Sequence, residues 1–121
     1  MKLRHLFIIS TALIILIAAS KPLFADMDEF TGEEWFSMPA SHRTSAVSTA
    51  KYRLEDKGVL LSKSLDEYVN DVNDVFKKNS DTSAKSVTKI FHALVYSNEP
   101  GAKKVMDELI KKKQIEKIEK L

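Results

Sequence analysis

Two histidines are the side chains of this sequence that most readily suggest metal chemistry. His42 and His92 are fifty positions apart, and no HxH, HExxH or HxxxH spacing occurs in the chain. A zinc site would need both imidazoles and a carboxylate to meet through tertiary packing, because the sequence supplies no closely spaced ligand pair. The sequence therefore favours ordinary surface or helix-flank histidines, and we predict no metal.

A row of acidic residues is the second chemical feature. Glu67, Asp71 and Asp74 follow at i, i+4 and i+7, which places them on one face of a helix. A calcium loop would need a glycine to turn its ligands inward, and none is present here. General acid–base catalysis would require Glu67, Asp71 and His92 to converge in one pocket. A solvated helix face is the simpler interpretation.

The chain lacks the sequence motifs typical of catalytic nucleophiles and of cofactor sites. The chain has no cysteine and no G-x-S-x-G, and no S-x-x-K motif stands at a plausible site. Three glycines are too few for a phosphate-binding loop. The absence of cysteine further excludes disulfides, thiolate metal sites and a lipoprotein anchor. We therefore predict a protein that is not an enzyme and carries no cofactor.

The first 25 residues have the layout of a secretory signal peptide. Lys2 and Arg4 precede an apolar run over 6–19, and a break leads to the small residue Ala25. Cleavage is predicted after Ala25, with Ala19 as the alternative. The apolar run is shorter than the roughly 20 residues that span a bilayer, which disfavours an uncleaved anchor. A periplasmic or secreted protein is expected.

Cleavage would change the charge balance of the chain. The full sequence has a net charge of +2, but the predicted signal carries three bases and no acid. The mature chain then has 16 basic and 17 acidic residues, a net charge of −1. Since binding to nucleic acid depends on a positive field, we predict no nucleic-acid partner.

An acidic segment, 26–38, should open the mature protein. Thr31 and Glu34 fit a capping box, which predicts a short helical turn bearing Trp35 and Phe36. In one interpretation Trp35 anchors this segment to the rest of the fold. In the other, Trp35 and Phe36 form an exposed aromatic anchor for a partner.

Four helices are expected in the domain over 39–121. Apolar residues recur at helical spacing over 40–57, with Gly58 as a left-handed cap, and again over 65–78 after a Ser64–Glu67 capping box. A third helix should begin at a cap within 81–83, and a turn over 97–101 should precede the last helix. Connections of two to seven residues favour a small all-α bundle of antiparallel neighbours.

The C-terminal end is basic. Residues 103–121 carry seven lysines and four acids, and Lys111, Lys112 and Lys113 are consecutive. A solvated helix end stabilised by its dipole is one interpretation. Weak contact with an anionic envelope surface or an acidic protein is the other. Beyond Lys113 the apolar spacing leaves the helical stripe, so the end is expected to project from the bundle or to fray.

Two short motifs give a resemblance to known proteins. Thr31-Gly32, Trp35 and Met38 stand before a basic helix, and the run 95–100, VYSNEP, precedes the last helix. This pattern resembles small exported helical bacterial proteins, including the Rap1a/Tai-type immunity proteins of type VI secretion. The resemblance implies a small periplasmic interaction protein. The present sequence differs from the pattern in lacking any cysteine.

Together these features predict an exported, non-enzymatic helical protein that binds another protein in the bacterial envelope, with an immunity-type role as one form of that activity. The alternative is a periplasmic carrier that holds a small ligand or lipid between its helices. In either case no membrane anchor is expected to remain after cleavage. The residues assigned to partner binding are Trp35, Phe36, Lys111, Lys112 and Lys113.

Overall fold

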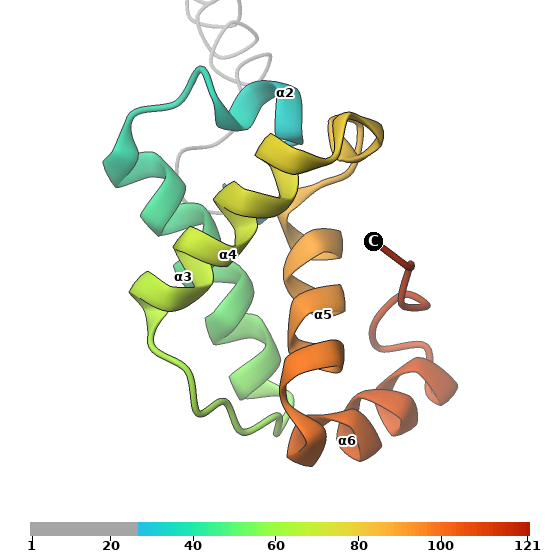
Figure 1. The fold of residues 1–121 in the computed structure, drawn as a ribbon. Helices are drawn as coiled ribbons and strands as arrows, with labels where there is room; N and C mark the ends of the chain where they lie inside the picture. Colours follow the sequence, from blue (N-terminus) through green and yellow to red (C-terminus); the bar gives the residue numbers. More distant parts are fainter. Residues whose placement is uncertain (1–26) are drawn as a thin grey trace, which may run out of the picture.

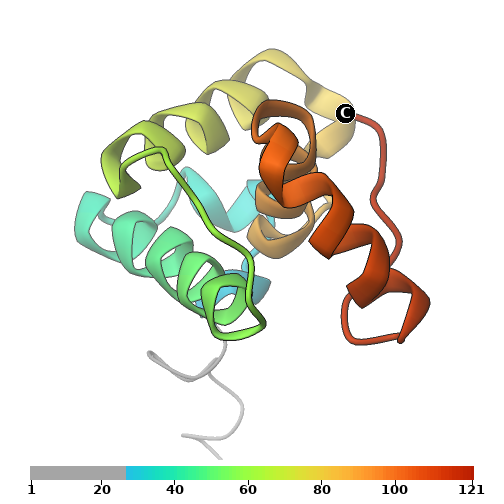
Figure 2. The ribbon, with the colours of Figure 1, turned by 90° about the horizontal axis from the view of Figure 1, so that it is seen from below.

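The computed structural model describes residues 27–121, and this part of the chain is all-α, as predicted (Figure 1). The predicted signal peptide lies outside the described residues. Two 3-10 turns accompany five α-helices: η1 (Met27–Glu29), α2 (Gly32–Trp35), α3 (Ala40–Asp56), α4 (Leu65–Lys78), η2 (Ser80–Thr82), α5 (Val87–Asn98) and α6 (Pro100–Lys111). Figure 2 shows α5 between the α3–α4 pair and α6, and α5 contacts all three.

The helix α3 forms where the apolar spacing predicted it. Its buried stripe consists of Ala46, Val47, Ala50 and Leu54. Gly58 ends the helix with a positive φ of 93°, and the N–H of Val59 donates to the carbonyl of Leu54. This arrangement is a Schellman motif, in which glycine adopts the left-handed conformation without steric cost. The chain reversal buries Val59 in the core.

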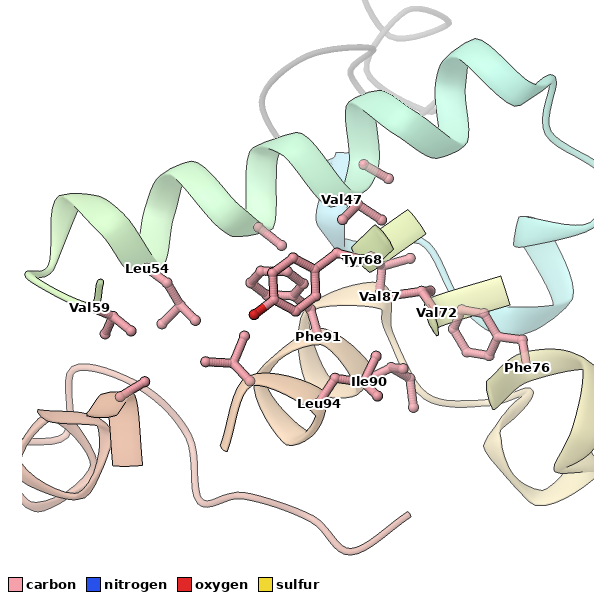
Figure 3. Close-up of a cluster of buried hydrophobic side chains, with 14 of the residues drawn as sticks. Val47, Leu54, Val59, Tyr68, Val72, Phe76, Val87, Ile90, Phe91 and Leu94 are labelled. Carbon is pink, nitrogen blue, oxygen red and sulfur yellow. The ribbon is translucent and has the colours of Figure 1, made fainter. Parts of the chain in front are cut away.

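The helix α4 begins with the predicted capping box. The Ser64 hydroxyl accepts a hydrogen bond from the Glu67 N–H, and the Glu67 carboxylate accepts one from the Ser64 N–H. Its buried face meets α5, where the Tyr68 ring lies edge-on to Phe91 with 4.9 Å between ring centroids (Figure 3). The centre of the core is therefore an aromatic contact between neighbouring helices.

The start of α5 differs from the sequence prediction. Its cap is Ser86, whose hydroxyl accepts from the Lys89 N–H, and not a residue within 81–83. Residues 83–87 instead pair with the N-terminal segment: Gly32 donates to the Lys85 carbonyl, and Val87 donates to the Phe30 carbonyl. Because of this extended pairing, α5 begins only at Val87. The pairing depends on residues more than fifty positions away in the sequence.

The connection between α5 and α6 is shorter than predicted. Glu99 alone separates the helices, and Pro100 is the first residue of α6, where its missing N–H leaves no bond unmade. With one connecting residue, α6 turns away from the line of α5 instead of running antiparallel to it (Figure 1). The Glu99 carboxylate accepts hydrogen bonds from the Ser62 N–H, which ties the α3–α4 loop to this corner.

The C-terminal segment, residues 112–121, folds back toward α5 and does not project from the bundle (Figure 1). Lys113 has a positive φ of 59°, and the N–H of Gln114 donates to the Leu109 carbonyl. This second Schellman motif reverses the chain after α6. Ile115 and Ile118 then pack partly buried against the core. The two isoleucines are three residues apart, a spacing that does not continue the helical stripe of α6 and is compatible with a non-helical segment.

Candidate functional site

Trp35 lies inside the fold. Its side chain is fully buried, its ring centroid is 5.7 Å from that of Phe76, and its indole N–H donates to the side-chain oxygen of Asn73 at 3.1 Å. The residue therefore holds α2 against α4. Of the two sequence interpretations, the structure has the anchoring arrangement, and the indole is not accessible to a partner.

Phe36, the next residue, faces solvent and is 49% exposed. Arg43 lies beside it, with the centre of its guanidinium 5.9 Å from the Phe36 ring centroid. Two carbonyls fix this guanidinium, because Nε donates to Trp35 at 2.9 Å and Nη2 donates to Phe36 at 3.4 Å. We call Phe36 and Arg43 the aromatic–arginine pair.

The three consecutive lysines lie elsewhere on the surface. Lys111 ends α6, Lys112 caps it and Lys113 reverses the chain, and all three are exposed. Figure 1 shows α2 and α6 near opposite ends of the molecule. The structure therefore does not bring the predicted aromatic and basic partner-binding residues together into one surface.

A buried acid links the N-terminal turn to two helices. Asp28 of η1 is 1% exposed, and its carboxylate oxygens accept hydrogen bonds from the Nη1 of Arg53 on α3 at 2.9 and 3.0 Å. The Thr88 hydroxyl on α5 contacts the same carboxylate at 2.7 Å. A buried carboxylate is tolerated only when paired and hydrogen-bonded, and Asp28 meets both conditions.

This network forms part of the wall of a cavity of about 410 Å³. The cavity lies between η1, the end of α3, the first half of α5 and the C-terminal segment. Its lining combines both signs of charge with an imidazole and two isoleucines, contributed in part by Lys57, Lys89, His92, Ile115, Glu116 and Ile118. A volume of this size is typical of sites that hold small molecules.

Among the side chains that line this cavity, His92 has a pKa far from its ordinary value. Burial, followed by the positive charge of Lys57, lowers the pKa of His92 to about 4, although Asp28 acts in the opposite direction. The imidazole is therefore neutral at pH 7, with one nitrogen able to donate and one able to accept. Neither nitrogen has a hydrogen-bond partner among the described residues.

The C-terminal segment closes the cavity with few polar bonds. Glu119 lies 3.1 Å from the Lys85 ammonium and 3.5 Å from that of Lys89. The hydrogen bond from Lys85 lowers the pKa of Glu119. These ion pairs are partly exposed, so each contributes little to stability. The packing of Ile115 and Ile118 is the main attachment of the segment.

The three residues that acid–base catalysis would require do not share this cavity. Asp71 lies on α4 and binds the Lys63 ammonium at 2.6 Å, in a hollow that His92 does not line. Glu67 is occupied by the capping box. The convergence that catalysis by Glu67, Asp71 and His92 would require is therefore not found.

The two histidines are not neighbours. His42 lies in the first turn of α3, whereas the α3 side chains around His92 come from the other end of that helix. Within residues 27–121 no group of three or more histidine and acidic side chains could hold a metal ion. In the same range no helix is long and apolar enough to cross a membrane.

Sequence reasoning missed the cavity and its network. Asp28 and Arg53 are 25 positions apart and carry no motif. The available signal was one acid within an acidic segment, and such a pattern gives no indication of burial. Comparisons of the chain with protein-family models, curated proteins and solved structures found no match.

Proposed function

We propose that this chain is an exported, non-enzymatic helical protein that acts by binding another protein in the periplasm or outside the cell. The aromatic–arginine pair is the observation that supports it. Aromatic and arginine side chains are enriched at the centres of protein interfaces. Phe36 offers an exposed apolar ring, and the two carbonyl contacts of Arg43 hold its guanidinium in place before binding.

Pre-positioning is the physical reason for preferring this surface. Ordering a long side chain at an interface costs about 0.5–1.5 kcal/mol, and Arg43 is already ordered in the free protein. The lysines at the end of α6 lack such restraints and suit weak contact with an acidic surface. The resemblance to immunity proteins supports a secreted toxin as the class of partner.

Site-specific photocrosslinking tests this proposal. A benzophenone amino acid would replace Phe36 in one variant and Tyr52 in another, since Tyr52 is also an exposed aromatic, at 68%. With extract of the native cell envelope, we expect one discrete crosslinked protein from position 36. An excess of unmodified protein should abolish it. Equal crosslinking from both positions, or none from position 36, would contradict the proposal.

A small-ligand or lipid carrier is the second candidate function, and the cavity beside His92 supports it. Native mass spectrometry of protein purified from its own envelope provides the test. A reproducible additional mass that is lost on unfolding would support a carrier. A bare polypeptide mass from several preparations would count against it.

A further inference from the structure

The cavity beside His92 contains charges that are already paired and charges that are not. Arg53 is bonded to Asp28, and Lys89 lies 3.9 Å from Glu116 and 3.5 Å from Glu119. These pairs neutralise most of the charged side chains that line the cavity. The lining charges without an ion-pair partner determine which ligand the cavity can accept.

Lys57 and Lys117 are the lining cations that form no ion pair with any described residue. The Lys57 ammonium has one long contact, at 3.4 Å, to the carbonyl of Arg53. Its remaining donors are therefore available to a ligand. His92 lies close enough for the charge of Lys57 to affect its titration, and it adds a neutral donor with no protein partner.

We infer that this cavity binds a small organic monocarboxylate, with Lys57 and the His92 imidazole contacting the carboxylate and Ile115 and Ile118 contacting the apolar part. The Lys57 ammonium and the neutral N–H of His92 together match one negative charge. Glu29 also lines the cavity, and its charge would repel a phosphate or another polyanion more strongly than a monocarboxylate. The two isoleucines supply the apolar contact that such ligand sites usually contain.

This inference deepens the second candidate function and does not depend on protein binding at Phe36. The carboxylate could come from an alkyl acid or from the end of a peptide. Hexanoate and N-acetyl-leucine represent these two sources, and hexylammonium is the control of opposite charge. NMR of labelled protein would follow the His92 imidazole and the isoleucine methyl groups during each titration.

We expect saturable shifts at His92, Ile115 and Ile118 with one or both carboxylates, and none with hexylammonium. A bound carboxylate should also raise the pKa of His92, because an adjacent negative charge favours the imidazolium form. Lys57→Gln should weaken binding about tenfold or more, as expected for loss of a charge-assisted hydrogen bond. Lys112→Gln is the matched control and should leave binding unchanged.

These titrations distinguish failure of the carboxylate assignment from failure of the carrier function. Saturable binding of hexylammonium alone would leave a carrier standing but overturn the carboxylate assignment. The carboxylate assignment would also be overturned if Lys57→Gln bound the carboxylates as tightly as the unmodified protein, because binding would then occur elsewhere. Because Lys57 is exposed, its replacement should leave the fold intact, and the unchanged spectrum of the free variant would verify this.

Discussion

One guanidinium nitrogen of Arg53 serves both carboxylate oxygens of Asp28, at 2.9 and 3.0 Å. The two ends of this pair differ in environment, because Asp28 is 1% exposed and the Arg53 side chain is 40% exposed. The loss of either partner should therefore have unequal consequences. A carboxylate left alone inside the fold is costly, whereas a guanidinium near the surface can be solvated by water.

Replacing the two partners separately tests this asymmetry. Arg53→Met should lower the free energy of unfolding by about 2 kcal/mol, since within residues 27–121 Asp28 would retain only the Thr88 hydroxyl as a side-chain partner. Asp28→Ala should cost about 1 kcal/mol, because the Arg53 side chain is already 40% exposed and its charge remains accessible to water. Urea denaturation of both variants provides the measurement. A larger loss in Asp28→Ala would contradict this account.

Gly32 is predicted to tolerate no side chain. A Cβ at this position would lie 2.6 Å from Cδ1 of Phe76 and 2.9 Å from the Cα of Ser83. Gly32→Ala should destabilise the protein by roughly 1–3 kcal/mol through overpacking. Gly101→Ala is the matched control, because its Cβ would meet nothing within 4 Å. That helical substitution should stabilise by about 0.5–1 kcal/mol. Thermal unfolding of the pair should show shifts of opposite sign.

Lys113 carries the left-handed conformation that glycine adopts more readily. Such a conformation costs a residue with a side chain roughly 1–2 kcal/mol. The greater freedom of glycine in the unfolded chain offsets part of the gain. Lys113→Gly should therefore stabilise the protein by about 0.5 kcal/mol. Lys112→Gly is the control, because Lys112 has a φ of −83° and its replacement should destabilise the protein. Denaturant titrations would measure both variants, and equal changes in their free energies of unfolding would contradict the left-handed conformation of Lys113.

The lowered pKa of His92 predicts a dependence of stability on pH. Between its unfolded pKa of 6.5 and its folded pKa of about 4, the unfolded chain binds a proton that the folded protein does not. The stabilising contribution is thus complete above pH 6.5 and is lost as the pH falls toward 4. The loss should be on the order of 2–3 kcal/mol.

Comparison with His92→Gln isolates this contribution from the carboxylates that titrate in the same range. The free energy of unfolding of both proteins would be measured from pH 7 to pH 4. The free energy of unfolding of the wild-type protein should fall relative to that of His92→Gln as the pH falls. Parallel curves would show that His92 does not titrate as described.

Local sequence patterns were sufficient to predict the helices but not the long-range pairing. The apolar spacing of α3 and α4 and the Ser64 capping box depend on residues a few positions apart, so they can be recognised directly. The start of α5 could not be, because its position depends on hydrogen bonds between 83–87 and 30–33. The direction of α6 likewise depends on a single connecting residue, Glu99.

The candidate sites show the same division. An aromatic anchor was predicted at Trp35 and Phe36, but the pattern could not determine which ring is buried. The indole N–H of Trp35 finds Asn73, 38 positions away, and that contact directs it inward. The cavity beside His92 also required the chain reversal at Lys113, a residue type that seldom marks such a turn.

The pairing of the N-terminal turn with the start of α5 also affects how the molecule folds. Asp28 and Thr88 are separated by 60 positions, so a large loop must close before their bond can form. Such non-local contacts slow folding relative to a bundle of sequential neighbours. The earliest part of the domain to be synthesised therefore completes its contacts late, because a nascent chain interrupted before α5 offers it Arg53 of α3 but neither Thr88 nor the extended segment over 83–87.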